Sequence, residues 1–343
     1  MDKLKVCVIG STGLVGKEFC RRLAVHPYFE IAGLYASEKR PDITFQNLAG
    51  NDTLPDLCVE KTDVDSILSK KYDLIFSAVS EKTASSIELE LSWKGQRVFT
   101  NASGNRMRQD VPILVPEINR EHMILVGKNN GFIVANGNCS TISLALSVAP
   151  LMELEMKKID VTTMQAVSGA GYPGTPALDV ISGVYPHIPG EEEKISSETK
   201  KIFGTVHNNA IEPSEISVNP ICTRIPVRDG HTEAVFVELQ ENVEENDVKN
   251  LFRNFRNGKI AGKNLPSLPY NSVIFHDSPE RPHTNLDLNA GKNFLTSGMP
   301  VSVGHFSIKG NMVSFISLIH NIVRGAAGSS ILNAEFLHEE GFL

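Results

Sequence analysis

The segment 136–141, Asn-Gly-Asn-Cys-Ser-Thr, places a cysteine where a protein could use it as a nucleophile. It follows the apolar run 131–136, which predicts a strand, and precedes apolar residues at helical spacing, which predict a helix. Cys139 would lie at or just before the helix N-terminus, where free N–H groups and the helix dipole favour the reactive thiolate. Asn138 and nearby backbone N–H groups could hold an oxyanion. The alternative is a structural cysteine, against which the polar, glycine-containing surroundings argue.

A thiolate nucleophile needs an acid–base partner, and His231 is the candidate among the 10 histidines, although a single histidine is more often structural. His231 stands in a polar turn directly before an alternating run that predicts a strand. Arg224 lies earlier on another strand-like run, which could present it beside His231. A guanidinium there could bind a substrate carboxylate through two hydrogen bonds.

The segment 10–16, Gly-Ser-Thr-Gly-Leu-Val-Gly, follows the first predicted strand and opens a predicted helix. Glycines in this place allow a tight turn and a close approach of the backbone to a pyrophosphate, which the helix N-terminus attracts. The spacing is G-x-x-G-x-x-G rather than the commoner G-x-G-x-x-G, and the alternative is a tight turn without a ligand. The segment predicts a dinucleotide site with the contacts Gly10, Ser11, Thr12, Gly13, Leu14 and Val15.

The end of the second predicted strand indicates which nicotinamide nucleotide would fit. An NAD enzyme usually has an acid there for the ribose 2′-hydroxyl, whereas the 2′-phosphate of NADP needs hydroxyls and cations. Ser37, Lys39 and Arg40 favour NADP, while Glu38 is ambiguous. The alternative for these residues is a solvated turn.

The pattern of apolar and polar residues changes along the sequence, which predicts two domains, as the length of 343 residues also suggests. Residues 1–136 alternate strands with helices, which predicts an α/β domain with a Rossmann-type, doubly wound parallel sheet that binds NADP. Residues 137–320 contain longer alternating runs, which predict an α+β catalytic domain with a mostly antiparallel sheet. The tail 313–342 predicts a helix, and we expect residues 321–343 to pack on the first domain.

The composition limits the classes of partner. The net charge is -7 and the isoelectric point is about 5.8, which argues against nucleic acid and anionic membranes as partners. No apolar run reaches the ~20 residues of a membrane helix, and the N-terminus lacks a signal-peptide pattern, so we expect a cytoplasmic protein. The five cysteines are odd in number and form no C-x-x-C pair, which predicts neither a disulfide framework nor a metal site.

Together these motifs resemble those of the aspartate-β-semialdehyde dehydrogenase family, in the branch found in archaea and fungi. The resemblance runs nearly from end to end. One departure is Gly137, where the family often has proline; glycine loosens the loop before the nucleophile without removing a reacting group. The segments that carry the resemblance are 10–16, 103–107, 115–119, 138–141, 165–171, 230–235 and 321–328.

The resemblance implies reduction of L-aspartyl 4-phosphate to L-aspartate 4-semialdehyde by NADPH, with release of phosphate, on the route to lysine, threonine, methionine and isoleucine. Cys139 would carry the acyl group as a thioester, which divides one hard step into two easier ones. His231 would be the acid–base group, and Gln165 would orient the intermediate. The second domain would also form the contacts of a homodimer or homotetramer.

The same resemblance assigns the binding residues. Arg224 would hold the substrate α-carboxylate and Glu191 its ammonium, while Lys194 and Arg106 would hold the phosphate, with Asn138 beside them. This inventory suits the substrate, because two anionic groups need cations and an ammonium needs an acid. The further cofactor contacts would be Ser77, Ser168, Gly169 and Asn321.

Three other functions remain open at this point. A malonyl-CoA or succinyl-CoA reductase of the same fold would need no acid for an ammonium, and neither would an N-acetylglutamyl-phosphate reductase. Glu191 and Lys194 therefore favour the aspartyl substrate, although a solvated helix start is the plain alternative for the segment 191–194. A non-catalytic protein that senses NADP is a rival of another class, and the presence of Cys139, His231 and Arg224 argues against it.

Overall fold

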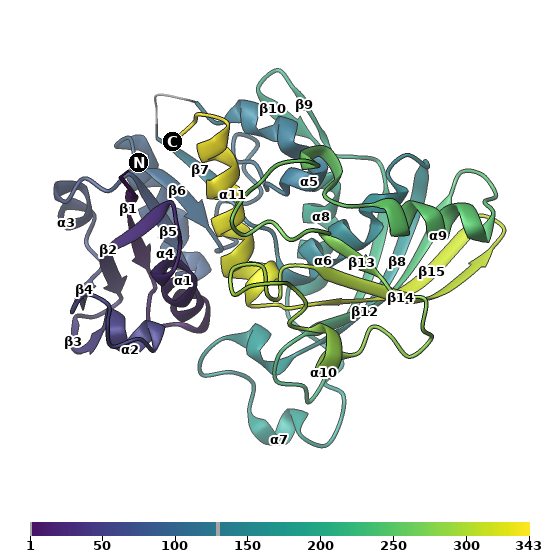
Figure 1. Cartoon of the computed structure of the whole chain (residues 1–343), viewed down its shortest axis with the longest axis horizontal. Coiled ribbons are helices and arrows are strands. Elements are labelled where there is room, and N and C mark those ends of the chain that lie inside the picture. The colour runs from purple at the N-terminus through teal and green to yellow at the C-terminus, as the bar shows by residue number, and fades with distance from the viewer. Residues whose placement is uncertain (1, 128–130) are drawn as a thin grey trace.

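Two β-sheets organise the chain, of which this computed structural model describes residues 2–127 and 131–343 (Figure 1). The first sheet has the strand order β3-β4-β2-β1-β5-β6-β7, and all neighbours run parallel except β3 and β4. The predicted doubly wound domain is therefore confirmed. Its strands are β1 (Leu4–Ile9), β2 (Phe29–Ala36), β3 (Arg40–Thr44), β4 (Cys58–Lys61), β5 (Leu74–Ser77), β6 (Arg97–Thr100) and β7 (Phe132–Ala135). Its helices are α1 (Leu14–Ala24), α2 (Phe45–Ala49), α3 (Val64–Ser69) and α4 (Glu81–Trp93).

The strand order of the first sheet reverses at β1, which has β2 on one side and β5 on the other. Ligands of open α/β sheets bind outside the carboxyl ends of the strands at such a reversal. The segment 10–16 leaves β1 at this point. Gly10 has a φ of 80°, and a Cβ there would lie 2.5 Å from the carbonyl oxygen of Ala78, just after β5. Only glycine allows this turn, so the loop stays close to the end of β5.

The second sheet is mixed and mostly antiparallel, as predicted, with the order β11-β8-β12-β15-β14-β13. Only its two outer pairs, β11 with β8 and β13 with β14, run parallel. The helices α6 (Cys139–Val148), α8 (Glu191–Ile202) and α9 (Glu245–Asn254) pack against it. The strands are β8 (Met156–Gln165), β11 (Ser217–Arg224), β12 (His231–Leu239), β13 (Val273–Phe275), β14 (Val301–Lys309) and β15 (Met312–Ile319). Smaller elements are α5 (Pro116–Asn119), α7 (Ala177–Val180), α10 (Thr284–Asp287) and the hairpin of β9 (Thr205–His207) and β10 (Ala210–Glu212).

The prediction of one helix over 313–342 is wrong for its first part. Residues 312–319 form β15, which pairs antiparallel with β12 on one side and β14 on the other. The sequence Val-Ser-Phe-Ile-Ser-Leu-Ile alternates and contains β-branched residues, which suit a strand between two neighbours. The chain then forms a π-helical turn (Val323–Ala327) and α11 (Gly328–Glu339), which packs against α1 and β6 of the first domain.

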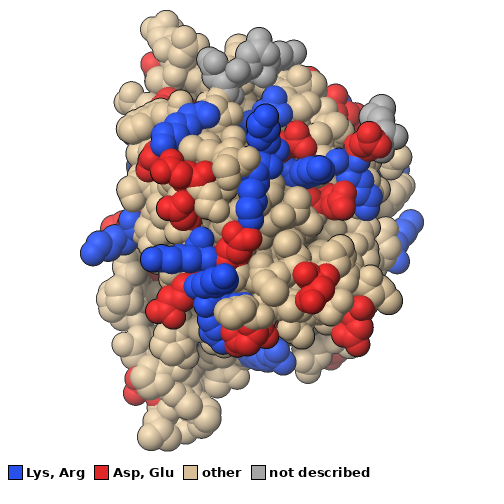
Figure 2. All heavy atoms as spheres, turned by 90° about the vertical axis from the view of Figure 1, so that its left-hand side faces the viewer, with Lys and Arg blue, Asp and Glu red and all other residues tan. Residues whose placement is uncertain are grey.

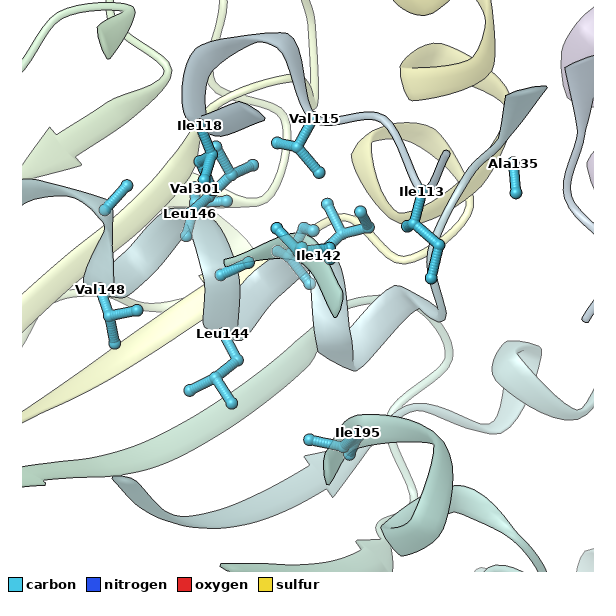
Figure 3. Packing of buried hydrophobic residues seen from close by; sticks show 14 of the residues in the cluster. Ile113, Val115, Ile118, Ala135, Ile142, Leu144, Leu146, Val148, Ile195 and Val301 are labelled. Carbon is cyan, nitrogen blue, oxygen red and sulfur yellow. The ribbon is translucent and has the colours of Figure 1, made fainter. Parts of the chain in front are cut away.

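Helix α6 is buried on all sides, and its packing fixes the helix end at which Cys139 lies. Its side chains Ile142, Leu144 and Leu146 pack among apolar groups from several elements, including Ile195 of α8 and Val301 of β14 (Figure 3). Burial of one such side chain contributes about 1.5–3 kcal/mol. The N-terminus of α6 is therefore held rigidly between the two domains.

The surface of the first domain carries both kinds of charge. Figure 2 shows lysine and arginine side chains interspersed with aspartate and glutamate over this face. Of the helices described, none combines the length and apolarity needed to cross a membrane.

Candidate active site

Cys139 is the first residue of α6, so the predicted strand–turn–helix position is confirmed. Asn138 caps the helix: its Oδ1 accepts hydrogen bonds from the N–H groups of Ser140 (2.9 Å) and Thr141 (3.3 Å). An N-cap of this kind contributes about 1 kcal/mol to helix stability. The Oδ1 of Asn138 is therefore already bonded to the first turn of α6, and this bonding fixes the backbone on which Cys139 lies.

His231 contacts the nucleophile directly, with its Nε2 3.1 Å from the Cys139 Sγ. Its other ring nitrogen, Nδ1, accepts a hydrogen bond from the N–H of Ala166 at 3.0 Å. A nitrogen that accepts cannot also carry a proton, so the neutral imidazole has its proton on Nε2, facing the sulfur. His231 therefore donates a hydrogen bond to Cys139 in this arrangement.

Arg224 and Gly169 complete the surroundings of His231. The Nη1 of Arg224 donates to the carbonyl oxygen of Ala166 at 2.6 Å, so the same residue holds both the imidazole and the guanidinium. A Cβ on Gly169 would lie 3.0 Å from the imidazole and 3.2 Å from Arg224. Arg224 and His231 thus lie together, and the Gly169 backbone packs closely on both.

The charge state of Cys139 differs from the expectation that the helix end favours the thiolate. Burial raises the pKa of the thiol to about 12, and the negative charge of Glu191 acts in the same direction. The backbone N–H at the helix start and Arg106 lower the pKa, but by less. Burial, with the positive charge of Arg224, also lowers the pKa of His231 to about 3. The ligand-free site therefore holds a neutral thiol beside a neutral imidazole.

The raised pKa predicts how Cys139 reacts with iodoacetamide. Only the thiolate reacts, so the rate at Cys139 of the ligand-free protein should rise by roughly tenfold per pH unit from pH 7 to beyond pH 9. Peptide mass spectrometry would measure this rate, with Cys58, the other partly exposed thiol, as the internal control. A plateau at neutral pH would contradict the expectation and indicate a preformed thiolate.

Glu191, at the start of α8, is hydrogen-bonded to two of the predicted site residues. Its carboxylate accepts hydrogen bonds from the Nδ2 of Asn138 (2.9 and 3.0 Å) and from the Nε2 of Gln165 (3.2 Å). It is also near enough to Cys139 and Arg224 to influence the pKa of both. An acid thus lies among the residues expected to hold the amino acid part of the substrate.

Two further charged residues on α8, Glu198 and Lys201, were not predicted from the sequence. Both side chains are buried, and they repeat the Glu-x-x-Lys spacing of Glu191 and Lys194 seven residues later. Residues seven apart lie on the same face of a helix, so one stripe of α8 carries all four charges. This repeat of Glu-x-x-Lys is the sequence feature that could have indicated the buried pair. The charges alone, however, do not show whether that face of α8 is buried or exposed to solvent.

A cavity of about 540 Å³ joins the two domains at the nucleophile. Among the residues that line it are Cys139, Arg106 and Lys194, so the two predicted phosphate cations face the space beside the sulfur. The Nζ of Lys194 lies 3.9 Å from the carboxylate of Glu81. The Nε of Arg106 is buried and has no hydrogen-bond partner in the described part of the chain.

The glycine segment borders the same cavity, which Gly13, Leu14 and Val15 line. Helix α1 begins there without a side-chain cap, so its first N–H groups are available to an anionic ligand. The hydroxyl of Ser11 instead faces inward and donates to the carbonyl oxygen of Tyr35 at 3.1 Å. The first turn of α1 thus fits a dinucleotide phosphate, and Ser11 supports the loop.

The other predicted cofactor residues fall into four places. Ser168, Gly169 and Asn321 line the cavity, and Asn321 ties them together by donating to the Ser168 hydroxyl (2.9 Å) while accepting from the N–H of Gly230 (2.8 Å). Thr12 is half-buried in the turn before α1. Ser77 is fully buried at the end of β5. Ser37 and Lys39 are exposed just after β2 and are not among the residues that line the cavity.

Gly325 is a further residue that the sequence analysis did not assign to the site. It lines the cavity, and a Cβ there would lie 2.7 Å from the Cβ of Cys139. The π-helical turn that contains Gly325 therefore packs against the nucleophile, and any side chain would displace one of them. No motif or residue spacing in the sequence indicates this contact, because it depends on the fold.

Comparisons with known proteins agree with this geometry. The family models "Semialdehyde dehydrogenase, NAD binding domain" and "Semialdehyde dehydrogenase, dimerisation domain" match residues 5–125 and 148–324. The chain is 40% identical to the aspartate-semialdehyde dehydrogenase of Archaeoglobus fulgidus, over 98% of this chain and 99% of the relative. It is 33% identical to the malonyl CoA reductase (NADP) of Metallosphaera sedula, over 99% and 98%.

A solved structure extends the likeness to the whole fold. The aspartate semialdehyde dehydrogenase of Candida albicans, determined with NADP, has a TM-score of 0.86 and 32% identity, with 100% of both chains covered. The chain therefore belongs to the semialdehyde dehydrogenase family, in the branch that contains archaeal and fungal aspartate-semialdehyde dehydrogenases.

Proposed function

We propose that the chain is an NADP-dependent aspartate-semialdehyde dehydrogenase, which converts L-aspartyl 4-phosphate to L-aspartate 4-semialdehyde and phosphate in amino-acid biosynthesis. The observation that carries the proposal is the cavity in which Cys139 lies between a dinucleotide loop and the cations Arg106 and Lys194. The relatives with this activity cover nearly the whole chain. A cytoplasmic location, as expected from the sequence, belongs to the same proposal.

The two domains divide the work in this proposal. Residues 1–136 with 321–343 bind the nucleotide, and residues 137–320 carry the catalytic residues and the contacts between subunits. The first turn of α1 holds the pyrophosphate, while the loop 168–171 and Asn321 approach the nicotinamide. Ser37 and Lys39 receive the 2′-phosphate, for which their exposure after β2 leaves room. NADPH, when bound, supplies the hydride for the reduction.

The substrate lies with its anionic and cationic groups on matching side chains. Arg224 binds the α-carboxylate and Glu191 the ammonium, while Arg106 and Lys194 bind the phosphate. The Cys139 sulfur attacks the acyl carbon, and the bond from this carbon to the phosphate oxygen breaks. The thiol proton leaves with the phosphate, so the products are the Cys139 thioester and hydrogen phosphate. Gln165, held by Glu191, orients the acyl group.

His231 acts in the second half of the reaction. One hydride and one proton reduce the thioester through a thiohemiacetal to the aldehyde and the free thiol. The carbon–sulfur bond breaks in this half, and negative charge develops on the sulfur. The Nε2 of His231 lies 3.1 Å from that sulfur, and its N–H stabilises the charge.

The proposal is tested by a pair of substrates. Reduction of NADP by aspartate semialdehyde should require phosphate and should exceed the rate with NAD. Oxidation of NADPH by malonyl-CoA is the contrasting assay, because one relative is a malonyl CoA reductase. Activity with malonyl-CoA alone would overturn the proposal, and inactivity with both would favour a protein that only senses NADP.

We further propose that the chain forms a homodimer through the uncovered face of the second sheet. Opposite residues of adjacent strands share a face, and one row across this sheet contains Ile221, Ala234 and Ile316. Phe236, two residues after Ala234 on β12, lies on the same face. Ile221 is 59% exposed and Phe236 is 45% exposed. The same face also carries the polar residues Thr162, Asp160 and Ser314. Large apolar side chains exposed on such a face are typical of contacts between subunits.

Replacing Phe236 by glutamate should weaken this contact. Burial of the new charge between two subunits would raise the dissociation constant by about 100-fold or more. Light scattering after size-exclusion chromatography should then show the monomer mass of 37.5 kDa at concentrations at which the original chain is dimeric. Trp93→Glu, at an aromatic residue 77% exposed on α4, is the matched control. An unchanged mass for Phe236→Glu would show that the interface lies elsewhere. If the original chain is a homotetramer, the same substitution should reduce it to a smaller assembly.

A further inference from the structure

Glu198, on α8, connects two parts of the site that are far apart in the sequence. It is 1% exposed. Its Oε1 accepts a hydrogen bond from the Nη1 of Arg106 at 2.9 Å, and its Oε2 accepts one from the backbone N–H of Asn138 at 2.6 Å. One carboxylate thus holds both a cation that faces the cavity and the backbone immediately before Cys139.

Lys201, one turn further along α8, binds the backbone of the segment that carries Arg106. Its Nζ donates to the carbonyl oxygens of Arg106 (2.6 Å) and Arg108 (2.5 Å). Burial lowers the pKa of this ammonium to about 8. Helix α8 therefore fixes Arg106 at its side chain through Glu198 and at its main chain through Lys201.

The arrangement fixes Arg106 where its side chain borders the cavity. Its Nη1 is bonded to Glu198 and its Nη2 to the carbonyl oxygen of Asn101. The Nε is buried without a partner in the described residues, and the side chain lines the cavity. Glu198 compensates the buried charge before a ligand arrives and keeps the guanidinium from turning away. A phosphate group would then meet a fixed donor at a fixed distance from the sulfur.

We propose that Glu198 is a positioning residue that couples the phosphate-binding guanidinium of Arg106 to the backbone carrying Cys139. This proposal rests on the function proposed above, because it assigns Arg106 to phosphate. A carboxylate suits the task because it has two acceptor oxygens for two donors. A glutamine has only one acceptor oxygen, and its amide hydrogens would oppose whichever donor remained.

The variant Glu198→Gln tests the coupling. The KM for phosphate in the phosphate-dependent oxidation of aspartate semialdehyde should rise by about 10-fold or more, the effect of one hydrogen bond to a charged group. The KM for the aldehyde should change by less than about threefold, because Arg224 and Glu191 bind it. Glu193→Gln, at an exposed glutamate of the same helix, is the matched control and should behave as the original chain.

A double-mutant cycle with Arg106→Met separates coupling from general damage. If Glu198 acts through Arg106, adding Glu198→Gln to Arg106→Met should not raise the KM for phosphate further. Equal rises in both KM values, or additive effects in the cycle, would overturn the proposal. Should Glu198→Gln fail to fold, Lys201→Met is the second variant, with an expected rise in the phosphate KM of about 3–10-fold; no rise in that variant counts against the proposal.

A binding measurement keeps the test independent of turnover. Inorganic phosphate should slow the alkylation of Cys139 by iodoacetamide, and Glu198→Gln should require about 10-fold more phosphate for the same protection. If the original chain shows this protection without phosphate-dependent turnover, the proposed function fails while the coupling stands. Equal protection in both chains would refute the coupling, whatever the substrate is.

Discussion

Replacing Cys139 by serine should lower kcat by on the order of 10⁴-fold or more, the largest loss expected for any single change in this chain. The hydroxyl keeps nearly the same volume at the first position of α6, so the packing against Gly325 and His231 is retained. The chemistry is lost because an alcohol is a far weaker nucleophile than a thiol. It also leaves no thioester to accept a hydride, and an ester of serine is reduced with more difficulty.

Steady-state assays with aspartate semialdehyde, NADP and phosphate would measure this loss. Without phosphate, the original chain should accumulate an acyl group that mass spectrometry locates on Cys139, and Cys139→Ser should not. Cys58→Ser is the control, because Cys58 is the other partly exposed thiol and lies on β4, next to the edge strand β3 of the first sheet. Activity above a few per cent in Cys139→Ser, with an acyl group on another residue, would refute the assignment of the nucleophile.

The position of Cys139 could be predicted because its determinants are local. A strand, a turn that contains glycine and a helix follow one another within a short segment, and this order alone puts residue 139 at the helix start. The same holds for the segment 10–16 before α1. The partnership with His231 is different in kind, because it depends on how β12 pairs with β8 and on where α6 lies above them. The sequence could nominate His231 from its polar turn and from Arg224 nearby, but the contact itself depends on the fold.

The parts that the sequence analysis missed depend on burial. The helix end was expected to favour the thiolate, but its effect is small beside the removal of water from the sulfur, which raises the pKa of Cys139. The strand β15 is apolar enough to fit a helix as well, and only its pairing with β12 and β14 fixes it as a strand. Glu198 carries the same charge as the exposed Glu193, and only the packing of α8 on α6 distinguishes them.

Replacing His231 by glutamine should lower kcat by about 10²–10³-fold, the second-largest effect expected. Glutamine can still direct an N–H toward the sulfur, but it cannot exchange a proton, and the N–H of Ala166 loses its acceptor. His207→Gln, at an exposed histidine in the β9–β10 hairpin, is the control and should have full activity. A loss of less than about threefold would show that the imidazole contributes little beyond packing.

The pH dependence then identifies which form of His231 works. Because burial and Arg224 lower the pKa of this imidazole to about 3, it should stay neutral at every pH from 5 to 9. A group with a lowered pKa gains its proton only at lower pH, so kcat/KM should show no histidine inflection near 6.5. It should instead increase with pH through 8, as the thiol with its raised pKa loses its proton. An acid limb near pH 6.5 that disappears in His231→Gln would mean that the imidazole takes up a proton in the working site. In that case the hydrogen bond from Ala166 to Nδ1 must break during turnover.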